Sequence, residues 1–268
     1  MTSTQTHGLK LHEYGDANQP ALLLLHGAGG LHRQWLAQIE GLQDRYYLLA
    51  PDLWLDNQDF SIPRLSEALS AGLKEKGIET LFVLGMDFGA SVAIQFALEH
   101  PQRVKGLILS GARYQHDSFD LFLSWALNLM PEKRLLGNFV KATAEHNPLI
   151  AQAMAEDLAR LGKSGFIGML KAMRKIDFKA RYGELKMPVE IWVGEYDRPN
   201  FIQEASDLHQ AIGQASLRII SEVGHGWQIE DPTLFNQLVD KVLSQIESGQ
   251  WVPVQEALQP PHSHNELE

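Results

Sequence analysis

Three side chains in this sequence could act together as a nucleophile, an acid and a base. Asp87 lies in the glycine-flanked segment 85–89, and Asp197 and His225 each follow an apolar run. A carboxylate can attack carbon, and an imidazole hydrogen-bonded to a second carboxylate can take a proton from water. These residue types therefore indicate a nucleophile–acid–base triad, provided that the fold brings them together.

The segment around Asp87 is predicted to be a sharp turn between a strand and a helix. Residues 81–84 form an apolar run before the turn, and residues 90–98 after it favour a helix. This pattern is typical of a nucleophile elbow, whose middle residue is exposed above a sheet and is usually serine. A helix N-cap is the alternative interpretation, because aspartate suits that position, but it gives the other two residues no role.

His225 is the candidate general base, since Gly224 and Gly226 suit a loop that holds an imidazole in a cleft. Asp197 would orient this imidazole and stabilise its charged form. Glu195 is the competing carboxylate, and we expect it to be a solvated loop residue.

Strands and helices alternate along the chain, and the candidate residues follow strands. The predicted strands are residues 21–25, 46–50, 81–84, 104–109, 189–193 and 216–220, and the predicted helices are residues 35–42, 62–76, 90–99, 201–212 and 232–248. Runs that are apolar on both faces suit parallel strands covered by helices. The pattern predicts an α/β fold with a doubly wound, mostly parallel sheet, which binds ligands beyond the carboxyl ends of its strands.

Residues 114–185 interrupt the alternation and contain no clear strand. Prolines and glycines divide them into several predicted helices: Pro131, Pro148, Gly162, Gly165 and Gly168. The expected organisation is a core of residues 1–113 and 186–250, an inserted helical cap of residues 114–185 and a flexible tail of residues 251–268. Most apolar residues of the insertion suit the core of the cap. The candidate substrate-pocket residues are Trp54, Trp125 and Trp227.

With these motifs in order, the chain resembles a capped member of the α/β-hydrolase fold superfamily over about residues 8–248. The resemblance rests on the elbow, on the acid and histidine that follow it, and on His26-Gly27-Ala28-Gly29-Gly30 after the first long strand. It implies an oxyanion hole formed by the backbone N–H groups of Ala28 and Phe88. It also implies that His26 supports the loop rather than acting in catalysis.

Aspartate at the elbow is shared with the epoxide hydrolases and dehalogenases of the superfamily. A carboxylate that attacks an sp³ carbon forms an alkyl ester, which water activated by His225 can hydrolyse. The leading hypothesis is therefore a hydrolase that acts on a small, mostly apolar substrate through a covalent aspartyl ester.

Other positions depart from those two groups and leave alternatives open. Phe88 and Ala28 offer no side-chain donor for a halide, and Gly29-Gly30 stands where epoxide hydrolases usually have proline. The rest of the chain looks more like serine members such as carboxylesterases and C–C bond hydrolases, in which Asp87 would replace a serine. A non-catalytic binding protein is the third hypothesis, although it would need neither the acid nor the histidine.

Composition limits the partners. The formal net charge of −10 argues against nucleic acid and anionic membrane surfaces. The chain has no cysteine, which excludes disulfides and thiolate sites and fits the cytoplasm. No apolar run approaches the roughly 18 residues of a membrane span, and the N-terminus lacks a signal-peptide core. We expect a small-molecule substrate, with no metal or organic cofactor implied and the oligomeric state open.

Overall fold

A computed structural model describes residues 2–55, 59–114, 129–144 and 147–258. Its nine-stranded sheet has the order β1-β2-β4-β3-β5-β6-β7-β8-β9. The strands are β1 (Thr2–Thr6), β2 (Leu9–Tyr14), β3 (Ala21–Leu25), β4 (Tyr47–Asp52), β5 (Leu81–Met86), β6 (Val104–Ser110), β7 (Val189–Gly194), β8 (Ser216–Ile220) and β9 (Gln255–Leu258). From β4 to β9 all neighbours are parallel. The predicted α/β class with a mostly parallel sheet is confirmed.

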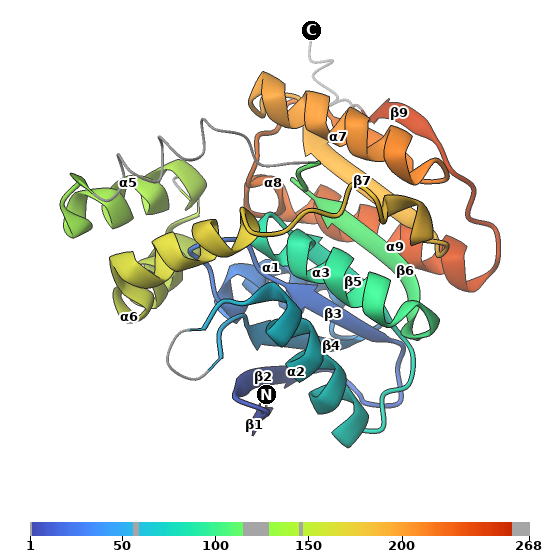
Figure 1. Cartoon of the computed structure of the whole chain (residues 1–268), viewed down its shortest axis with the longest axis horizontal. Coiled ribbons are helices and arrows are strands. Elements are labelled where there is room, and N and C mark those ends of the chain that lie inside the picture. Colours follow the sequence, from blue (N-terminus) through green and yellow to red (C-terminus); the bar gives the residue numbers. More distant parts are fainter. Residues whose placement is uncertain (1, 56–58, 115–128, 145–146, 259–268) are drawn as a thin grey trace, which may run out of the picture.

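Helices cover both faces of the sheet (Figure 1). One core contains residues of α2 (Ile62–Glu75), α3 (Phe88–Glu99) and α7 (Pro199–Ile212). The opposite core contains residues of α1 (Leu36–Leu42), α8 (Trp227–Glu230) and α9 (Pro232–Glu247). Successive side chains of a strand point to opposite faces, so Leu23 belongs to the first core and Leu24 to the second. This explains why the central strands are apolar throughout.

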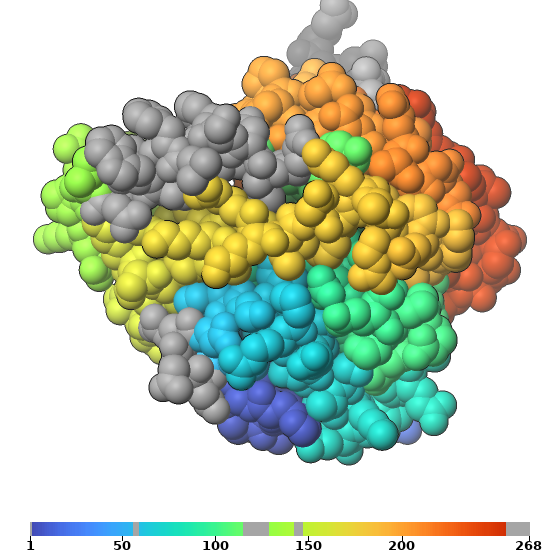
Figure 2. Space-filling view, in the orientation of Figure 1, coloured from blue at the N-terminus to red at the C-terminus, as the bar shows by residue number. Residues whose placement is uncertain are grey.

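Within the described residues, two α-helices lie between β6 and β7 in the chain. They are α5 (Glu132–Ala144) and α6 (Pro148–Met173), and we call them the helical insertion. They pack against each other, and α6 also contacts α3 and the single turn η1 (His32–Trp35). Figure 2 shows α6 and the segment after it, in yellow, lying directly on the core. The prediction that the insertion is a cap stays a prediction at this point.

The predicted helix breaks act in different ways. Pro131 precedes α5, and Pro148 starts α6, whose first turn is capped where the Ile150 N–H donates to Asn147 Oδ1 (3.2 Å). Gly162 has φ 69° and ψ 171° and kinks α6. By contrast, α6 continues through Gly165 and Gly168. Glycine costs a helix only about 1 kcal/mol relative to alanine, which packing can offset.

The sheet is longer at both ends than predicted. At the N-terminal end, β1 and β2 form an antiparallel extension that joins β4. At the other end, the prediction of a flexible tail from residue 251 is wrong for residues 255–258, because β9 pairs with β8. The Trp251 indole anchors this return by donating to Glu190 Oε1 (2.7 Å). Among helices in the described ranges, none is long and apolar enough to cross a membrane.

Candidate active site

Asp87 occupies a strained turn between β5 and α3. Its backbone has φ 48° and ψ −109°, a conformation that costs a non-glycine residue of order 1–3 kcal/mol. A Cβ on Gly89 would lie 2.0 Å from the Leu25 carbonyl oxygen, so only glycine allows this approach of the helix to β3. Asp87 precedes α3, but its side chain makes no capping hydrogen bond. The N-cap interpretation is therefore wrong, and the geometry is that of an elbow.

The Asp87 carboxylate is oriented by the loop after β3. The Ala28 N–H donates to Asp87 Oδ2 over 3.0 Å. Gly27 lies against the same side chain, since a Cβ there would be 3.5 Å from Asp87 Cβ. Phe88, the other predicted donor, is the first residue of α3, and the first N–H groups of a helix have no partner within it. One carboxylate oxygen is thus held at a predicted oxyanion donor.

Asp197 and His225 form the second half of the site. His225 Nδ1 lies 2.8 Å from Asp197 Oδ2, and Asp197 Oδ1 accepts the Arg198 N–H at 2.8 Å. With Nδ1–H donating to Asp197, Nε2 is left unprotonated as a possible base. The competing Glu195 instead accepts the Glu222 N–H at 3.0 Å. Of the two candidate carboxylates, Asp197 is therefore the one that contacts His225.

The end of β6 contacts both Asp87 and His225, through Ser110 and the following residue Gly111. The Asp87 N–H donates to the Ser110 carbonyl at 3.1 Å. The next residue, Gly111, has φ 59° and lies under the imidazole, where a Cβ would be 2.6 Å from His225 Cε1. The Phe201 ring packs beside the imidazole with centroids 5.0 Å apart. A glycine directly after a central strand could have identified Gly111 from sequence, whereas nothing in the spacing identified Phe201.

The electrostatics of His225 favour its charged form. Burial alone lowers the pKa of His225, but the hydrogen bond to Asp197 and the charges of Asp197 and Asp87 outweigh it, so that the pKa is raised. An imidazolium would therefore be stabilised between two carboxylates as it forms. The His225 side chain is 35% exposed while that of Asp197 is 3% exposed, so solvent reaches the imidazole much more than the carboxylate.

His26 supports the loop of residues 26–30 after β3, which we call the oxyanion loop because it contains the predicted donor Ala28. It is fully buried, its Nε2 accepts the Leu53 N–H at 2.8 Å, and its Nδ1 lies 2.9 Å from the Gly27 carbonyl. Burial lowers the pKa of His26 to about 4, so the ring is neutral with Nδ1–H donating. A neighbouring residue that the sequence did not indicate, Gln34, accepts the Gly27 N–H at 2.8 Å. The loop is thus fixed on both sides of Gly27.

The three candidate pocket residues have different outcomes. Trp227 lies in the core, 1% exposed, with its indole donating to Ser110 Oγ at 3.0 Å. Its ring packs on Trp192 and Phe235, which corrects the prediction that it lines the pocket. Trp54 is half-buried against the first core, and Trp125 lies outside the described residues.

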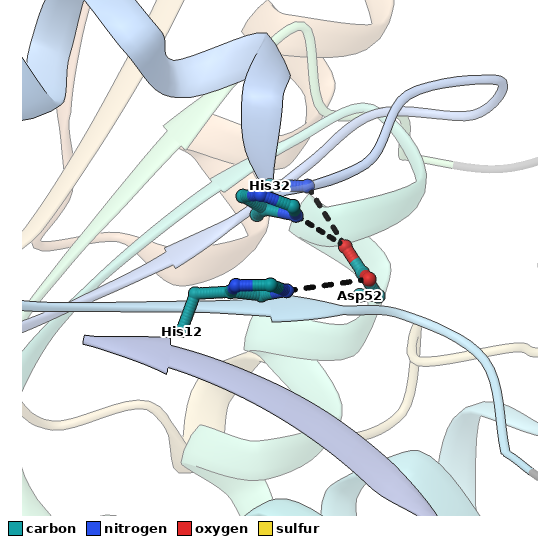
Figure 3. A group of neighbouring side chains, drawn as sticks. All are labelled: His12, His32 and Asp52. Carbon is teal, nitrogen blue, oxygen red and sulfur yellow. Dashed lines mark hydrogen bonds and ion pairs between the residues drawn. The ribbon is translucent and has the colours of Figure 1, made fainter. Parts of the chain in front are cut away.

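One further group of ligand-type side chains lies outside this site. His12, His32 and Asp52 are buried together, and within the described residues they alone form such a group (Figure 3). Asp52 accepts from His32 Nδ1 at 2.8 Å and from the His32 N–H at 3.1 Å, and its other oxygen lies 3.4 Å from His12 Nε2.

The geometry of this group does not suit a metal ion. The rings of His12 and His32 stack with centroids 3.4 Å apart and planes at 17°. An imidazole binds a metal in its own plane, so two stacked rings cannot both direct a nitrogen at one ion. The arrangement is better suited to two imidazoles that share one carboxylate as their hydrogen-bond acceptor.

Comparisons with known proteins agree with this geometry. Residues 53–232 match the family model described as "Serine aminopeptidase, S33". The putative carbamate hydrolase RutD of Escherichia coli is 27% identical over 250 residues, covering 84% of this chain and 91% of that protein.

Two solved structures illustrate the shared fold. The enol-lactonase of Burkholderia xenovorans superimposes with a TM-score of 0.79 at 17% identity, covering 91% of this chain and 100% of that one. An esterase of Exiguobacterium antarcticum gives a TM-score of 0.79 at 18% identity, covering 92% and 99%. The elbow, the Asp197–His225 pair and the matched family together show that this chain belongs to the serine aminopeptidase S33 family and is a hydrolase of the α/β-hydrolase fold.

Proposed function

We propose that the protein hydrolyses a small, mostly apolar substrate through a covalent ester on Asp87. The observation that carries this proposal is the hydrogen bond from the Ala28 N–H to Asp87 Oδ2 (3.0 Å). With Oδ2 held at the oxyanion donor, Oδ1 is the oxygen left to attack an sp³ carbon. The substrate class is that of epoxides or alkyl halides, whose reacting carbon accepts a carboxylate.

In the first step, an Oδ1 lone pair forms a bond to the substrate carbon. For an alkyl halide, the carbon–halogen bond breaks and its electron pair leaves with the halide ion. For an epoxide, the carbon–oxygen bond breaks, and the ring oxygen, which stays attached to the substrate, takes the electron pair and then a proton from water. The Asp87 carboxylate becomes a neutral alkyl ester, whose carbonyl oxygen is Oδ2. The Ala28 N–H already points at this atom, so no rearrangement of the donor is needed.

In the second step, His225 Nε2 takes a proton from water, and the hydroxide adds to the Asp87 carboxyl carbon. The negative charge of the tetrahedral intermediate develops on Oδ2, where the predicted donors Ala28 and Phe88 stabilise it. Collapse of the intermediate releases an alkoxide, which takes the proton from His225 and leaves as the alcohol. The Asp87 carboxylic acid then gives its proton to water, which restores the carboxylate. Asp197 stabilises the imidazolium throughout.

The helical insertion acts as a cap over this site in our proposal. The Phe139 ring of α5 and the Phe166 ring of α6 lie against Gly29, where a Cβ would be 2.7 Å and 2.9 Å from their nearest atoms. They bring apolar surface next to Ala28. This placement supports an apolar substrate and the exclusion of bulk water.

The trapped intermediate tests this proposal. His225→Ala removes the base of the second step and leaves the nucleophile intact. Incubating it with panels of epoxides and haloalkanes should give an adduct on the Asp87 peptide by mass spectrometry. An absence of both adduct and turnover across the two panels would reject the aspartyl-ester mechanism.

A serine-type scaffold is the second candidate, and the named relatives favour it. The structural neighbours include an esterase and a lactonase, and the curated relative is a putative carbamate hydrolase. If this chain acts on such acyl substrates, Asp87→Ser should raise the hydrolysis of p-nitrophenyl esters by orders of magnitude. A serine variant no better than the aspartate form would exclude this candidate.

A further inference from the structure

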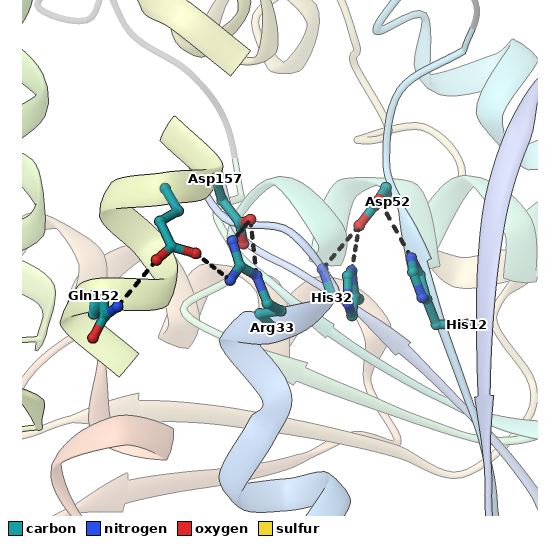
Figure 4. Close-up of polar contacts among 7 residues, drawn as sticks. His12, His32, Arg33, Asp52, Gln152 and Asp157 are labelled. Atoms are coloured by element: carbon teal, nitrogen blue, oxygen red, sulfur yellow. Dashed lines mark hydrogen bonds and ion pairs between the residues drawn. The ribbon is translucent and has the colours of Figure 1, made fainter. Parts of the chain in front are cut away.

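The single turn η1 links three parts of the molecule through consecutive side chains, of which Figure 4 shows His32 and Arg33. His32 contacts Asp52 at the end of β4. Arg33 reaches across to α6. Gln34 turns back to the oxyanion loop and accepts the Gly27 N–H. A displacement of this turn would therefore change contacts with the core, with the helical insertion and with the loop that contains Ala28.

The contact between Arg33 and α6 is close and partly buried. Arg33 donates through Nε (3.0 Å) and Nη2 to Asp157 Oδ1, and through Nη1 to Glu156 Oε2 (2.7 Å). Asp157 is 1% exposed, and no residue within the described ranges donates to its other oxygen, Oδ2. A buried carboxylate needs its charged partner, so α6 is tied to η1 at this point.

The path from η1 to the oxyanion donor is short. Gln34 accepts the Gly27 N–H at 2.8 Å, and the Gly30 N–H donates to the Gly27 carbonyl at 3.1 Å. The Gln34 side chain also lies against Gly30, where a Cβ would meet its amide carbon at 2.9 Å. Ala28 lies within this closed turn, so its N–H direction depends on where η1 sits.

We propose that Arg33 and Asp157 are positioning residues that couple the placement of α6 to the direction of the Ala28 N–H. This rests on the proposed function for its kinetic consequence, since the Ala28 donor stabilises the charge that develops on Asp87 Oδ2. The insertion is then more than a cover. When α6 is seated, the oxyanion donor is aligned, and when Arg33 loses Asp157, the donor is free to turn away.

The structural part of this proposal can be tested without a substrate. Arg33→Gln, Asp157→Asn and the double variant should each raise the hydrogen-exchange rate of the Ala28 amide on the order of tenfold, measured by NMR. The double variant should exchange no faster than either single variant, because both remove the same link. Arg45→Gln, which removes an exposed ion pair with Asp240, is the matched control and should leave Ala28 unchanged.

The kinetic part uses the alkylated enzyme. Arg33→Gln should slow the breakdown of the Asp87 ester more than its formation, so the alkylated fraction at steady state rises while KM falls with kcat. If no variant is ever alkylated, the proposed function fails while the Ala28 exchange result still decides the coupling.

Two results would overturn the coupling. One is unchanged Ala28 exchange in Asp157→Asn, a nearly isosteric variant that removes the charge with little change of shape and decides the question should Arg33→Gln fail to fold. The other is a rise spread evenly over β5 and α9, which would show global destabilisation instead of a local link.

Discussion

The molecule contains two aspartate–histidine arrangements that differ in what they leave free. At the candidate active site, Asp197 engages only Nδ1 of His225, and the imidazole is 35% exposed. In the second group, Asp52 is hydrogen-bonded to both His12 and His32, and all three side chains are buried. The same residue types therefore give a partly exposed pair in one place and a closed, buried group in the other.

This difference shows that the number of hydrogen-bond partners of the carboxylate, more than the residue types, determines what each group can do. Burial raises the pKa of Asp52, but the hydrogen bonds from His12 and His32 outweigh it and lower the pKa well below its usual value. For His225, the carboxylates raise the pKa against the effect of burial. The Asp52 group stabilises a carboxylate that stays charged, whereas the Asp197–His225 pair stabilises a positive charge on His225 when the imidazole takes up a proton.

The largest effect expected from this comparison is on turnover. His225→Gln should reduce kcat by on the order of 10³-fold, because general-base catalysis contributes about 10²–10⁴-fold. Thermal stability should change little, since this side chain is partly exposed. Steady-state kinetics with a substrate found in the adduct panels measures the loss, and His209→Gln on α7 is the matched histidine control. A variant that retains most of its activity would remove His225 from the mechanism.

The next effect is on stability and belongs to the closed group. Asp52→Asn should lower the free energy of unfolding by about 3 kcal/mol, because it removes the buried carboxylate that accepts hydrogen bonds from both imidazoles. Urea denaturation followed by circular dichroism measures the change.

The pH dependence of this contribution follows from the lowered pKa of Asp52. It is fully present above the unfolded value of about 3.9 and is lost as the pH falls through the folded value. Equal stability of variant and wild type at pH 7 would show that Asp52 has no such role.

A smaller effect concerns the pH profile. His225 acts as a base only when neutral, so its raised pKa places the acidic limb of the rate profile above the usual range for histidine. Asp197→Asn removes the hydrogen bond and the charge, and the limb should move to lower pH while the maximum rate falls. An NMR titration of the His225 Cε1–H checks the same shift without substrate.

The contribution of His225 to stability depends on pH in the opposite direction to that of Asp52. Because the folded pKa of His225 is raised, its contribution is fully present below the unfolded value of about 6.5 and is lost as the pH rises through the folded value. A limb that moves to higher pH in Asp197→Asn would contradict the assigned role of the acid.

The smallest effect is expected at Trp227. Trp227→Phe removes the indole donor to Ser110 Oγ and should cost about 1 kcal/mol of stability, with kcat and KM unchanged. Thermal melting and kinetics measured together check this. A changed KM would restore Trp227 to the substrate pocket.

Much of the fold could be predicted because periodicity reports burial directly. The apolar runs that became β3, β5, β6, β7 and β8 are buried on both faces, and covered parallel strands require this pattern. The strands that were missed, β1, β2 and β9, lie toward the two ends of the sheet. β1 has mostly exposed side chains, so its sequence lacks any apolar signal, and its place depends on pairing with β2.

For the site, the sequence indicated the residues that follow strands and missed the residues that support them through tertiary contacts. Asp87, Asp197 and His225 each stand after a strand in chain order, which the topology converts into proximity. Phe201 and the Arg33–Asp157 link depend on contacts between segments far apart in the chain, which no local pattern encodes. Gln34 lies only seven residues from its partner Gly27, but no motif in the sequence indicates that contact. Trp227 was misplaced because an aromatic residue after His225 suits a core and a pocket equally well.

The fate of water oxygen tests the central claim most directly. In a single turnover with excess enzyme in H₂¹⁸O, hydrolysis of an aspartyl ester at its carboxyl carbon places the label in Asp87. The account predicts a mass increase of about 2 Da, the difference between the two oxygen isotopes, in the peptide that contains Asp87, with unlabelled oxygen in the product. Label found only in the product, with none in Asp87, would mean that water attacks the substrate directly and would contradict the covalent mechanism.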